Sequence, residues 1–549
     1  MATDEFEHLY GNYIDDTYDC VDRIVLNAYF YMAQSGGGFR CWWRDLFGND
    51  DHLDNDHLMR FAGRFSRRIH AFAEKTGIPL IHCKRGERKH ETAEKYIPQD
   101  PGFKGLFCIL AGLAQAPVRE VKRCSNGQPH IQVKQPYPWV NHYFFHIIDP
   151  EWGHVVIRLC PHPPFNAGII LNGHEYVARK AMASNISFTK QGNCFTDIDN
   201  AADLARIADA MSDTFAVGRL EKVCERWIYS ACLCFALTLD KQQTSGFHYG
   251  YSVYQAEYSR NYLFNRGHEM DMIFNAVIDR TRAPLDIKIV KTIFGSKVRP
   301  HRNRKKKPRL EAVVESPVWD LTVFKVHYGK LTVKIYSKGE RVLRVESVAH
   351  NVNDLKCGRK IEFFPKIVAA LKKNLLRFIS VLRCLDATFI SEDGLENLPK
   401  PSMVGASRVA GIDVNNPRIR CVMSAMIALA ASPQGYTVSD LASKVREMMG
   451  GSPDIYSTRQ AAYDLKKLKA KGFVHKIEGS RRNEGTETGL RAMAAIQTLR
   501  EKVINPILAG CQKRKRGPKP KNWTTMDEHY HAIRLHMFEV FKLAGIATS

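Results

Sequence analysis

Two short segments of the chain contain many basic residues and no acidic residue, so neither can lie inside a folded domain. The first, Lys297–Arg309, reads KVRPHRNRKKKPR and holds eight Lys or Arg residues; the second, Lys513–Lys521, reads KRKRGPKPK and holds six. Both contain proline and neither shows apolar residues at helical spacing. Burying unpaired charges is costly, so both segments must be exposed. They divide the 549-residue chain, and several domains are expected.

These two basic arms also indicate the kind of partner. The chain carries a net charge of +23, and the 14 Lys and Arg residues of the arms supply more than half of it. Basic arms release counterions from any nucleic acid, so we expect contacts with phosphates. A solvated linker without a partner is the alternative. The expected contact residues are Arg304, Lys305, Lys306, Lys307, Lys513, Arg514, Lys515 and Arg516.

Composition excludes several other classes of protein. No apolar run approaches the ~18 residues of a membrane-spanning helix, so no membrane partner is expected. The N-terminal residues Met1–Glu7 are acidic, whereas a signal peptide begins with basic residues. The 14 cysteines are scattered singly, which favours reduced thiols over a disulfide framework. These features predict a cytoplasmic protein.

Strand-like and helix-like segments alternate along the chain, which predicts a multidomain α/β (mixed α+β) fold. Near the start, Arg23–Phe30 suits a strand, Gly36-Gly37-Gly38 a loop, and Asp54 or Asn55 can cap a helix that ends at Gly77. The predicted divisions are an N-terminal α/β domain at 1–136, a second α/β domain at 137–296, a basic linker at 297–310, a β-hairpin and helix domain at 311–397, a linker at 398–414, a winged helix-turn-helix at 415–505, and a basic tail with a terminal helix at 506–549.

The order of segments at 415–505 predicts the winged helix-turn-helix. Ser457 can cap a helix on which Ala461, Leu465 and Leu468 recur at helical spacing, and a hairpin of wing size follows Gly472. Such a helix reads DNA from the major groove. A surface for protein contacts is the alternative. The expected DNA-binding residues are Arg459, Gln460, Tyr463, Lys466 and Lys467 on the helix, with Arg481 and Arg482 on the wing.

The run Leu331–Glu346, LTVKIYSKGERVLRVE, holds the candidate catalytic residues Tyr336, Lys338, Arg344 and Glu346. Polar side chains alternate along two predicted strands, so a hairpin would bring Tyr336 close to Arg344 or Glu346. A phenol beside cations and a carboxylate could hold a phosphate, or act as a nucleophile with a divalent metal. The alternative is an amphipathic hairpin with its charged face in water.

Two further patterns have a structural and a functional interpretation. Asp51–His57 contains metal-ligand residue types, but its acids also suit the start of a helix, and we favour capping. Tyr251, Tyr254, Tyr258 and Tyr262 recur every three or four residues, which predicts a helical stripe. That stripe would pack in a core or stack bases of a single strand.

The LTVKIYSKGERVLRVE run is similar to the Arg/Lys-x-Tyr-Asp-Lys … Leu-Arg-x-Glu pattern of some phage and plasmid rolling-circle replication initiators. Ser337 stands where that pattern has Asp, and the run has no adjoining His-apolar-His pair. The resemblance implies that Tyr336 attacks a DNA phosphodiester, with Mg²⁺ or Mn²⁺ as the cofactor.

A broader resemblance covers most of the chain. DRIVLNAYF, DPEWGHVVIRL, IILNGHEYVARK, SVYQAEYSRNYLF and VKIYSKGERVLRVES occur in this order before the predicted winged helix. In this the chain resembles a family of uncharacterised bacterial proteins of about the same length. The resemblance implies this architecture and a bacterial source, and it supplies no active site.

Together these features predict a nucleic-acid-binding protein of a bacterial mobile-element or replication type, with DNA as the expected partner. One alternative is a metal-dependent, strand-cleaving initiator or transposase-like nuclease that uses Tyr336 and Glu346. The other is an RNA-binding protein that uses the tyrosine stripe and the basic linker.

Overall fold

A computed structural model describes most of the chain. The described residues are 4–84, 86–125, 128–281, 290–291, 310–318, 321–328, 330–338, 340–386, 390–432, 434–450, 455–505 and 524–543. The predicted contact residues of the two basic arms, Arg304 to Lys307 and Lys513 to Arg516, lie outside these ranges. The chain divides into two compact units: the first holds the described residues up to Phe274 and Glu315–Leu376, and the second holds the others.

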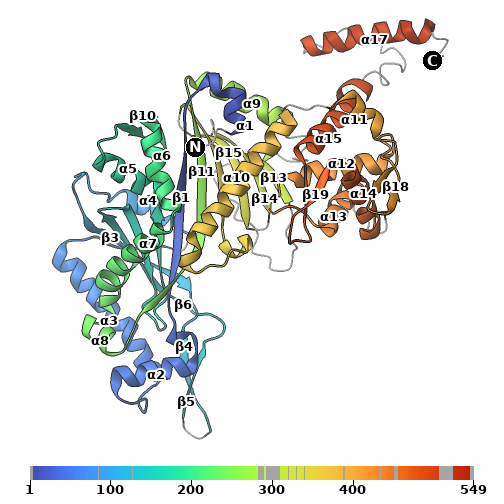
Figure 1. Ribbon diagram of the computed structural model, residues 1–549. Coiled ribbons are helices and arrows are strands. Elements are labelled where there is room, and N and C mark those ends of the chain that lie inside the picture. Colours follow the sequence, from blue (N-terminus) through green and yellow to red (C-terminus); the bar gives the residue numbers. More distant parts are fainter. Residues whose placement is uncertain are drawn as a thin grey trace. The chain divides into compact units, whose positions relative to one another are not determined.

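A large mixed sheet dominates the first unit (Figure 1), so the predicted mixed α/β class is confirmed. Neighbouring strands of this unit are antiparallel except β2 and β3, which are parallel. In sheet order they are β14 (Leu321–Tyr328), β15 (Leu331–Lys338), β16 (Val342–Ala349), β11 (Tyr249–Phe264), β1 (Ile14–Phe30), β8 (Ala167–Asn172), β7 (Gly153–Leu159), β6 (Trp139–Asp149), β3 (Gly105–Gln115) and β2 (Leu80–His82).

Strand β1 joins parts of the sheet that are distant in sequence. It pairs with β11 along nearly its whole length, and with β8 on its other side over residues 23–28. Strands from residues 1–136, 137–296 and 311–397, the three predicted α/β and hairpin domains, therefore lie in one sheet.

Helices lie on both faces of the sheet beside β1. Helix α5 packs against β1 on the side of Asp22, as does α6, whereas α10 contacts β1 through Asp19, which points to the opposite face. The helices that begin in the first unit are α1 (Glu5–Tyr10), α2 (Gly36–Phe47), α3 (Asn55–Thr76), α4 (Lys89–Glu94), α5 (Gly173–Ala183), α6 (Ala201–Asp209), α7 (Phe215–Cys224), α8 (Leu239–Thr244), α9 (Gly267–Thr281) and α10 (Phe364–Asp386).

Four short strands form two separate pairs, β4 (Arg119–Arg123) with β5 (Pro129–Val133) and β9 (Phe188–Lys190) with β10 (Phe195–Ile198). Strands β12 (Val290–Lys291) and β13 (Leu310–Val318) come before β14 in the strand order of the large sheet.

Two local predictions are wrong and one is confirmed. Gly36-Gly37-Gly38 forms the start of helix α2 rather than a loop. Ser35 is the N-cap of this helix, because its hydroxyl oxygen accepts a 3.0 Å hydrogen bond from the Gly38 amide. The tyrosines from Tyr251 to Tyr262 lie on strand β11 rather than on a helix. Asp54 is the N-cap of α3 as predicted, because its Oδ1 accepts a 2.8 Å hydrogen bond from the His57 amide.

The second unit is mainly helical. Residues 417–499 form, in order, a helix, two further helices, a hairpin and a last helix. Where a short strand was expected at Tyr436, the structure has an isolated β-bridge that joins Tyr436 to Asn483. The elements are α11 (Glu392–Asn397), β17 (Ser402–Val404), β18 (Ser407–Val409), α12 (Pro417–Ala430), α13 (Val438–Met448), α14 (Thr458–Ala470), β19 (Val474–Lys476), β20 (Asn483–Gly485), α15 (Glu487–Leu499) and α17 (Thr525–Leu543). Across the described residues of both units, every helix is too short or too polar to span a membrane.

Candidate functional site

One face of the large sheet carries polar side chains across four adjacent strands. Two rows of directly opposed residues cross from β1 through β11 and β16 to β15. Since alternate residues of a strand point to opposite faces, the two rows lie on the same side of the sheet. We call this group the polar face; its rows are Tyr18, Asn261, Arg344 and Tyr336, and Cys20, Ser259, Glu346 and Lys334.

Arg344 is the centre of a buried network on this face, and its side chain is completely inaccessible to solvent. Its Nε donates to Asn261 Oδ1 at 2.6 Å, and its Nη1 donates to Asp22 Oδ2 at 3.0 Å. Nη2 donates to the Asn193 carbonyl at 2.5 Å. A buried charge is tolerated only when it is paired and hydrogen-bonded, and this guanidinium meets both conditions.

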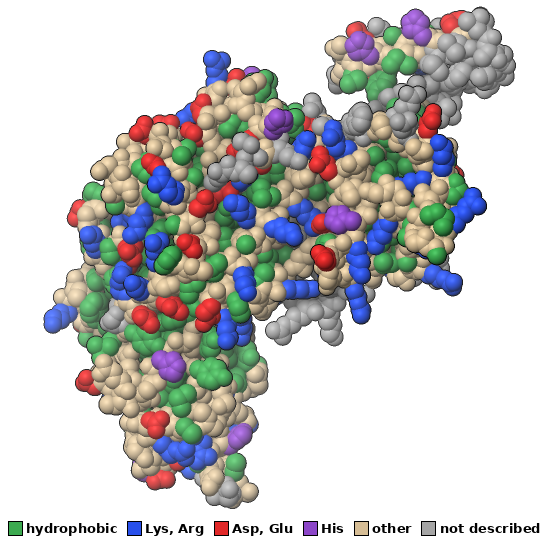
Figure 2. Space-filling model, viewed as in Figure 1, with side chains coloured by type: hydrophobic (Ala, Val, Ile, Leu, Met, Phe, Trp, Pro, Cys, Tyr) green, Lys and Arg blue, Asp and Glu red, His purple; other side chains and the backbone are tan. Residues whose placement is uncertain are grey.

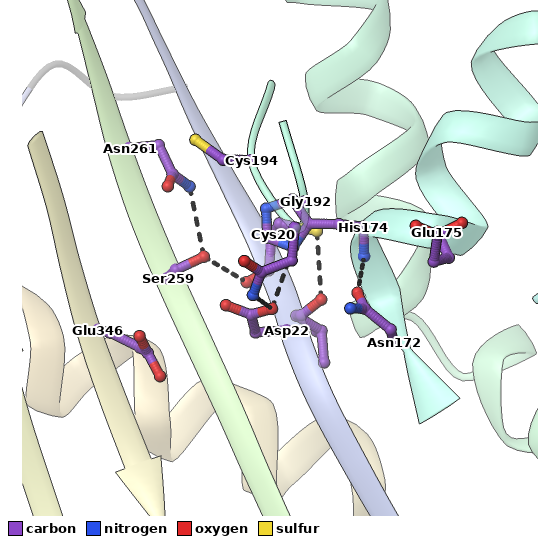
Figure 3. A network of polar contacts seen from close by, with 12 residues as sticks. Cys20, Asp22, Asn172, His174, Glu175, Gly192, Cys194, Ser259, Asn261 and Glu346 are labelled. Carbon is purple, nitrogen blue, oxygen red and sulfur yellow. Dashed lines mark hydrogen bonds and ion pairs between the residues drawn. The ribbon is translucent and has the colours of Figure 1, made fainter. Parts of the chain in front are cut away.

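His174 extends from helix α5 toward Asp22 on β1 (Figure 3) and closes the network. Its Nε2 lies 3.3 Å from Arg344 Nη2, and its Nδ1 lies 3.2 Å from Asp22 Oδ1, outside hydrogen-bond geometry. Because Arg344 can only donate, Nε2 must accept, which leaves the proton of a neutral ring on Nδ1. Burial lowers the pKa of His174, although the nearby Asp22 carboxyl acts in the opposite direction. Burial opposes ionisation of Asp22, but His174 and Arg344 outweigh it, and the pKa of this carboxyl lies below its ordinary value.

The residue before His174 lets α5 come this close to the sheet. A Cβ on Gly173 would lie 1.8 Å from the Val21 carbonyl oxygen of β1, closer than any side chain permits. Asn172 caps α5 through a 2.9 Å hydrogen bond from the His174 amide. Glycine at the helix start therefore places His174 beside Asp22.

Next to this network, Tyr336 and Lys334 both contact one carboxylate. The Tyr336 hydroxyl donates to Glu346 Oε2 at 2.7 Å, and Lys334 Nζ lies 3.0 Å from the same oxygen. The Lys334 amine also lies 5.0 Å from the centre of the Tyr336 ring. Burial and the charge of Glu346 raise the pKa of the Tyr336 phenol. The hydrogen bond positions Glu346 to accept the phenolic proton, whereas the raised pKa of the phenol opposes its release.

A second carboxyl group, that of Glu257, lies on this face two residues from Ser259. Burial and the charge of Glu346 raise the pKa of Glu257, on β11, to about 8. Burial opposes the charge on Lys334, but Glu346 and Glu257 outweigh it and raise the pKa of the amine. Near neutral pH the Glu257 carboxyl therefore holds its proton, and a protonated carboxyl of this kind can serve as a general acid.

The four predicted catalytic residues, Tyr336, Lys338, Arg344 and Glu346, lie on this face, but they do not all contact one another. Tyr336 contacts Glu346, whereas Arg344 extends to Asp22 and Asn261 on β1 and β11. The pKa of Lys338 is lowered by burial and by the charge of Arg344.

Sequence reasoning missed Asp22, His174, Glu257 and Asn261. Each of them is part of a segment already quoted for the broader resemblance, DRIVLNAYF, IILNGHEYVARK or SVYQAEYSRNYLF. Asp22, Glu257 and Asn261 lie on strands β1 and β11, which contain several other polar residues, and His174 lies on helix α5, so residue type alone did not single them out. These segments and VKIYSKGERVLRVES, which lie far apart in the sequence, meet at the polar face.

Within the described residues, no group of three or more His, Cys, Asp or Glu side chains is placed to hold a metal ion. In Asp51–His57 the Asp54 carboxylate caps α3, which is the role that we favoured. Among the histidines of the β6–β7 hairpin, His146 Nδ1 lies 3.0 Å from His154 Nε2, and burial together with His154 lowers the pKa of His146 to about 3.

The predicted DNA-binding residues lie on α14 and on the β19–β20 hairpin. Arg459 and Tyr463 are exposed, Lys466 and Lys467 are half-buried, and Arg481 is exposed at the hairpin. Two others have structural roles: Gln460 Oε1 accepts from the Ser457 amide at 2.8 Å, and Arg482 Nη1 donates to the Gly435 carbonyl at 2.8 Å.

Comparison of the chain with protein-family models, with curated proteins and with solved structures finds no match.

Proposed function

We propose that the protein binds nucleic acid and that duplex DNA docks on helix α14 of a C-terminal winged helix-turn-helix. The observation that carries this proposal is the charge on α14. Its only acidic residue, Asp464, is fully buried, whereas Arg459, Lys466 and Lys467 reach the surface. A helix surface with basic side chains and no carboxylate suits a phosphate backbone.

Helix α14 is also held rigidly, as a DNA-reading helix must be. Asp464 Oδ2 accepts a 2.9 Å hydrogen bond from the Tyr456 hydroxyl and lies 3.2 Å from Arg418 Nε on α12. Ala461, Leu465 and Leu468 are buried beneath the same helix. This packing leaves the opposite side of α14 for a ligand.

Tyr463 and Arg481 extend the proposed DNA surface. The Tyr463 side chain is 47% exposed, with Lys467 Nζ 5.1 Å from the centre of its ring, so a phenol and a cation are presented together. Arg481 would contact phosphate from the hairpin, as wing residues do. On the face shown in Figure 2, by contrast, Lys and Arg side chains of the first unit are interspersed with Asp and Glu.

The test is the salt dependence of duplex binding by the full chain. The double variant Lys466→Ala/Lys467→Ala should bind a 30-base-pair duplex more weakly, and the slope of log affinity against log salt concentration should fall by about 1.8. Fluorescence anisotropy between 50 and 200 mM NaCl measures both quantities. Arg481→Ala should reduce the slope by about 0.9.

The matched control is Lys222→Ala/Lys360→Ala, which removes two exposed lysines of the first unit. If this control lowers the slope as much as the α14 variant does, α14 is not the docking surface. An RNA duplex of the same sequence tests the competing RNA partner: equal affinity for it would contradict the choice of DNA.

A second candidate function, strand cleavage, is favoured by the 2.7 Å hydrogen bond from Tyr336 to Glu346. In this reaction Tyr336 Oη attacks phosphorus, Glu346 takes the phenolic proton, and the sugar oxygen of the broken P–O bond leaves as the alcohol once it is protonated. The product is a phosphotyrosyl ester. Lys334 would neutralise phosphate charge. A bound Mg²⁺ or Mn²⁺ would supply further charge stabilisation.

Nicking of supercoiled plasmid in Mg²⁺ or Mn²⁺ tests this second function. Tyr336→Phe should abolish nicking and the covalent protein–DNA adduct, whereas Tyr328→Phe on the neighbouring strand should retain both. Absence of nicking by the wild-type protein would exclude the reaction on this substrate.

A further inference from the structure

A pocket of about 370 Å³ is lined by residues of α2, of α3 and of the loop that joins them. Its volume is at the lower end of the range for small-ligand sites. The residues that matter here are the aromatic side chains of Trp43, Phe47 and Phe61, and the basic side chains of Arg60, Arg64 and His57. No carboxylate is among the side chains that line it.

The aromatic residues form a rigid wall with one accessible ring. Trp43 and Phe61 are 3% and 4% exposed and meet edge to face, with their ring centres 5.8 Å apart. Phe47 packs on Trp43 at 4.6 Å, yet its own side chain is 45% exposed. Lys241 Nζ lies 5.9 Å from the centre of the Phe47 ring. Phe47 therefore offers a partly exposed aromatic ring with a cation over one face.

The arginines are positioned by neighbours that leave them charged. Asp54 Oδ1 lies 2.8 Å from His57 Nδ1, so His57 Nε2 is free to accept from Arg60 Nη1 at 3.3 Å. The Arg64 guanidinium lies 5.9 Å from the centre of the Phe61 ring. Among the residues that the structure describes, neither Arg60 nor Arg64 forms an ion pair, whereas the nearby Asp50 pairs with Arg40 at 2.7 Å.

We propose that this pocket binds one nucleotide unit, with the base against Phe47 and the phosphate between Arg60 and Arg64. An aromatic ring stacks on any base, and guanidinium groups bind phosphate through two donors. Two sources share this chemistry, a free nucleotide and a nucleotide of a single strand. This proposal is independent of the duplex binding proposed for α14, because α14 belongs to the other unit of the chain.

The experiment uses the full chain and two probes: a 12-nucleotide single strand with one 2-aminopurine, and free 2-aminopurine deoxynucleoside monophosphate. Stacking quenches 2-aminopurine fluorescence. Phe47→Ala should weaken binding about tenfold and reduce the quenching. Phe47→Tyr, which keeps the ring, should restore both. For the single strand, Arg60→Ala/Arg64→Ala should lower the salt slope by about 1.4.

The matched controls are Phe215→Ala, which removes a 75% exposed ring elsewhere, and Arg67→Ala, which removes an exposed arginine of α3 outside the pocket. Both should bind like the wild-type protein. The proposal is wrong if neither probe is quenched, or if Phe47→Ala and Phe215→Ala behave alike. Quenching of the strand alone identifies a single-stranded polymer as the source, and equal quenching of both probes identifies the free nucleotide.

Duplex binding separates this proposal from the function assigned to α14. The pocket variants should keep the wild-type affinity for duplex DNA, and Lys466→Ala/Lys467→Ala should keep the 2-aminopurine quenching. Either activity can therefore fail while the other remains.

Discussion

Arg344 shows what a single buried charge contributes to this fold. Its guanidinium joins β16 to Asn261 on β11 and to Asp22 on β1, so three adjacent strands share one cation. A buried ion pair adds little net stability over an apolar pair, but removal of one partner leaves the other charged and without compensation. The role of Arg344 is thus to fix how the polar side chains of these strands are arranged.

We therefore predict that Arg344→Lys lowers the free energy of unfolding by about 3–5 kcal/mol, because an ammonium group cannot reach Asp22 and Asn261 together. The control is Arg341→Lys in the same hairpin. Arg341 pairs with Asp15 and Asp197 at the surface, at 2.9 Å each, and its replacement should cost about 1 kcal/mol or less. Urea denaturation followed by circular dichroism measures both changes, and similar midpoints for the two variants would contradict the prediction.

Glu257 gives the polar face a pH dependence. Its pKa in the folded protein is about 8, above its ordinary value of 4.5, so the folded state binds more protons than the unfolded state between these values. Stability from this group must then decrease as pH rises from about 4.5 to 8. We predict that Glu257→Gln removes this decrease, so that the stability difference between variant and wild-type protein changes by about 3–4 kcal/mol in favour of the variant from pH 5 to pH 8.

Thermal unfolding at both pH values measures the effect of Glu257. Glu340→Gln, which changes an exposed carboxyl in the β15–β16 turn, is the control and should leave the pH dependence unchanged. A pH profile of Glu257→Gln that is parallel to that of the wild-type protein would show that this carboxyl is not protonated in the folded state.

Sequence distance decides which residues of the polar face could be predicted. Tyr336 and Glu346 are 10 positions apart, so the register of one hairpin is enough to pair them. Arg344 is 83 positions from Asn261, 170 from His174 and 322 from Asp22. Those contacts depend on the order of strands in the sheet, which alternation within each strand does not determine.

At the scale of elements, the two errors have different physical causes. Tyr254, Tyr258 and Tyr262 are four residues apart, a spacing that fits one face of a helix and also one face of a strand. The buried residues of β11 are nearly continuous, as in a strand covered on both faces, so no period was available to distinguish the two. Gly36-Gly37-Gly38 was predicted as a loop from its composition, although close packing against backbone carbonyls is what requires glycine at Gly36 and Gly38.

Helix α2 therefore offers a matched pair of substitutions in its first turn. A Cβ on Gly36 would lie 2.3 Å from the Ile131 carbonyl oxygen, whereas a Cβ on Gly37 would have no atom within 4 Å. We predict that Gly36→Ala destabilises the protein by about 1–3 kcal/mol through overpacking. Gly37→Ala should be neutral or should stabilise by up to about 1 kcal/mol, because alanine is the better helix former. Melting temperatures compare the two, and equal effects would contradict the close approach.

At the scale of the whole molecule, strand β1 determines when the first unit can be completed. Ile14 pairs with Phe264, and β11 in turn pairs with β16, where Leu263 lies opposite Val342. A fold with contacts so far apart in sequence is slow to form. We predict that nascent chains stalled before Phe264 has left the ribosome remain sensitive to protease, and that chains stalled after Ala349 has emerged become resistant. Early protection of β1 would contradict this order.

This topology has a consequence for synthesis. Until Tyr249–Phe264 emerges from the ribosome, the 17-residue strand β1 has no partner on the side that β11 will occupy, and that side is a temporary edge. Open edges of long apolar strands pair with other chains. Neighbouring nascent chains on one polysome are therefore most exposed to mispairing while residues 31–248 are being translated, and slow translation of this region should increase aggregation of the newly made protein.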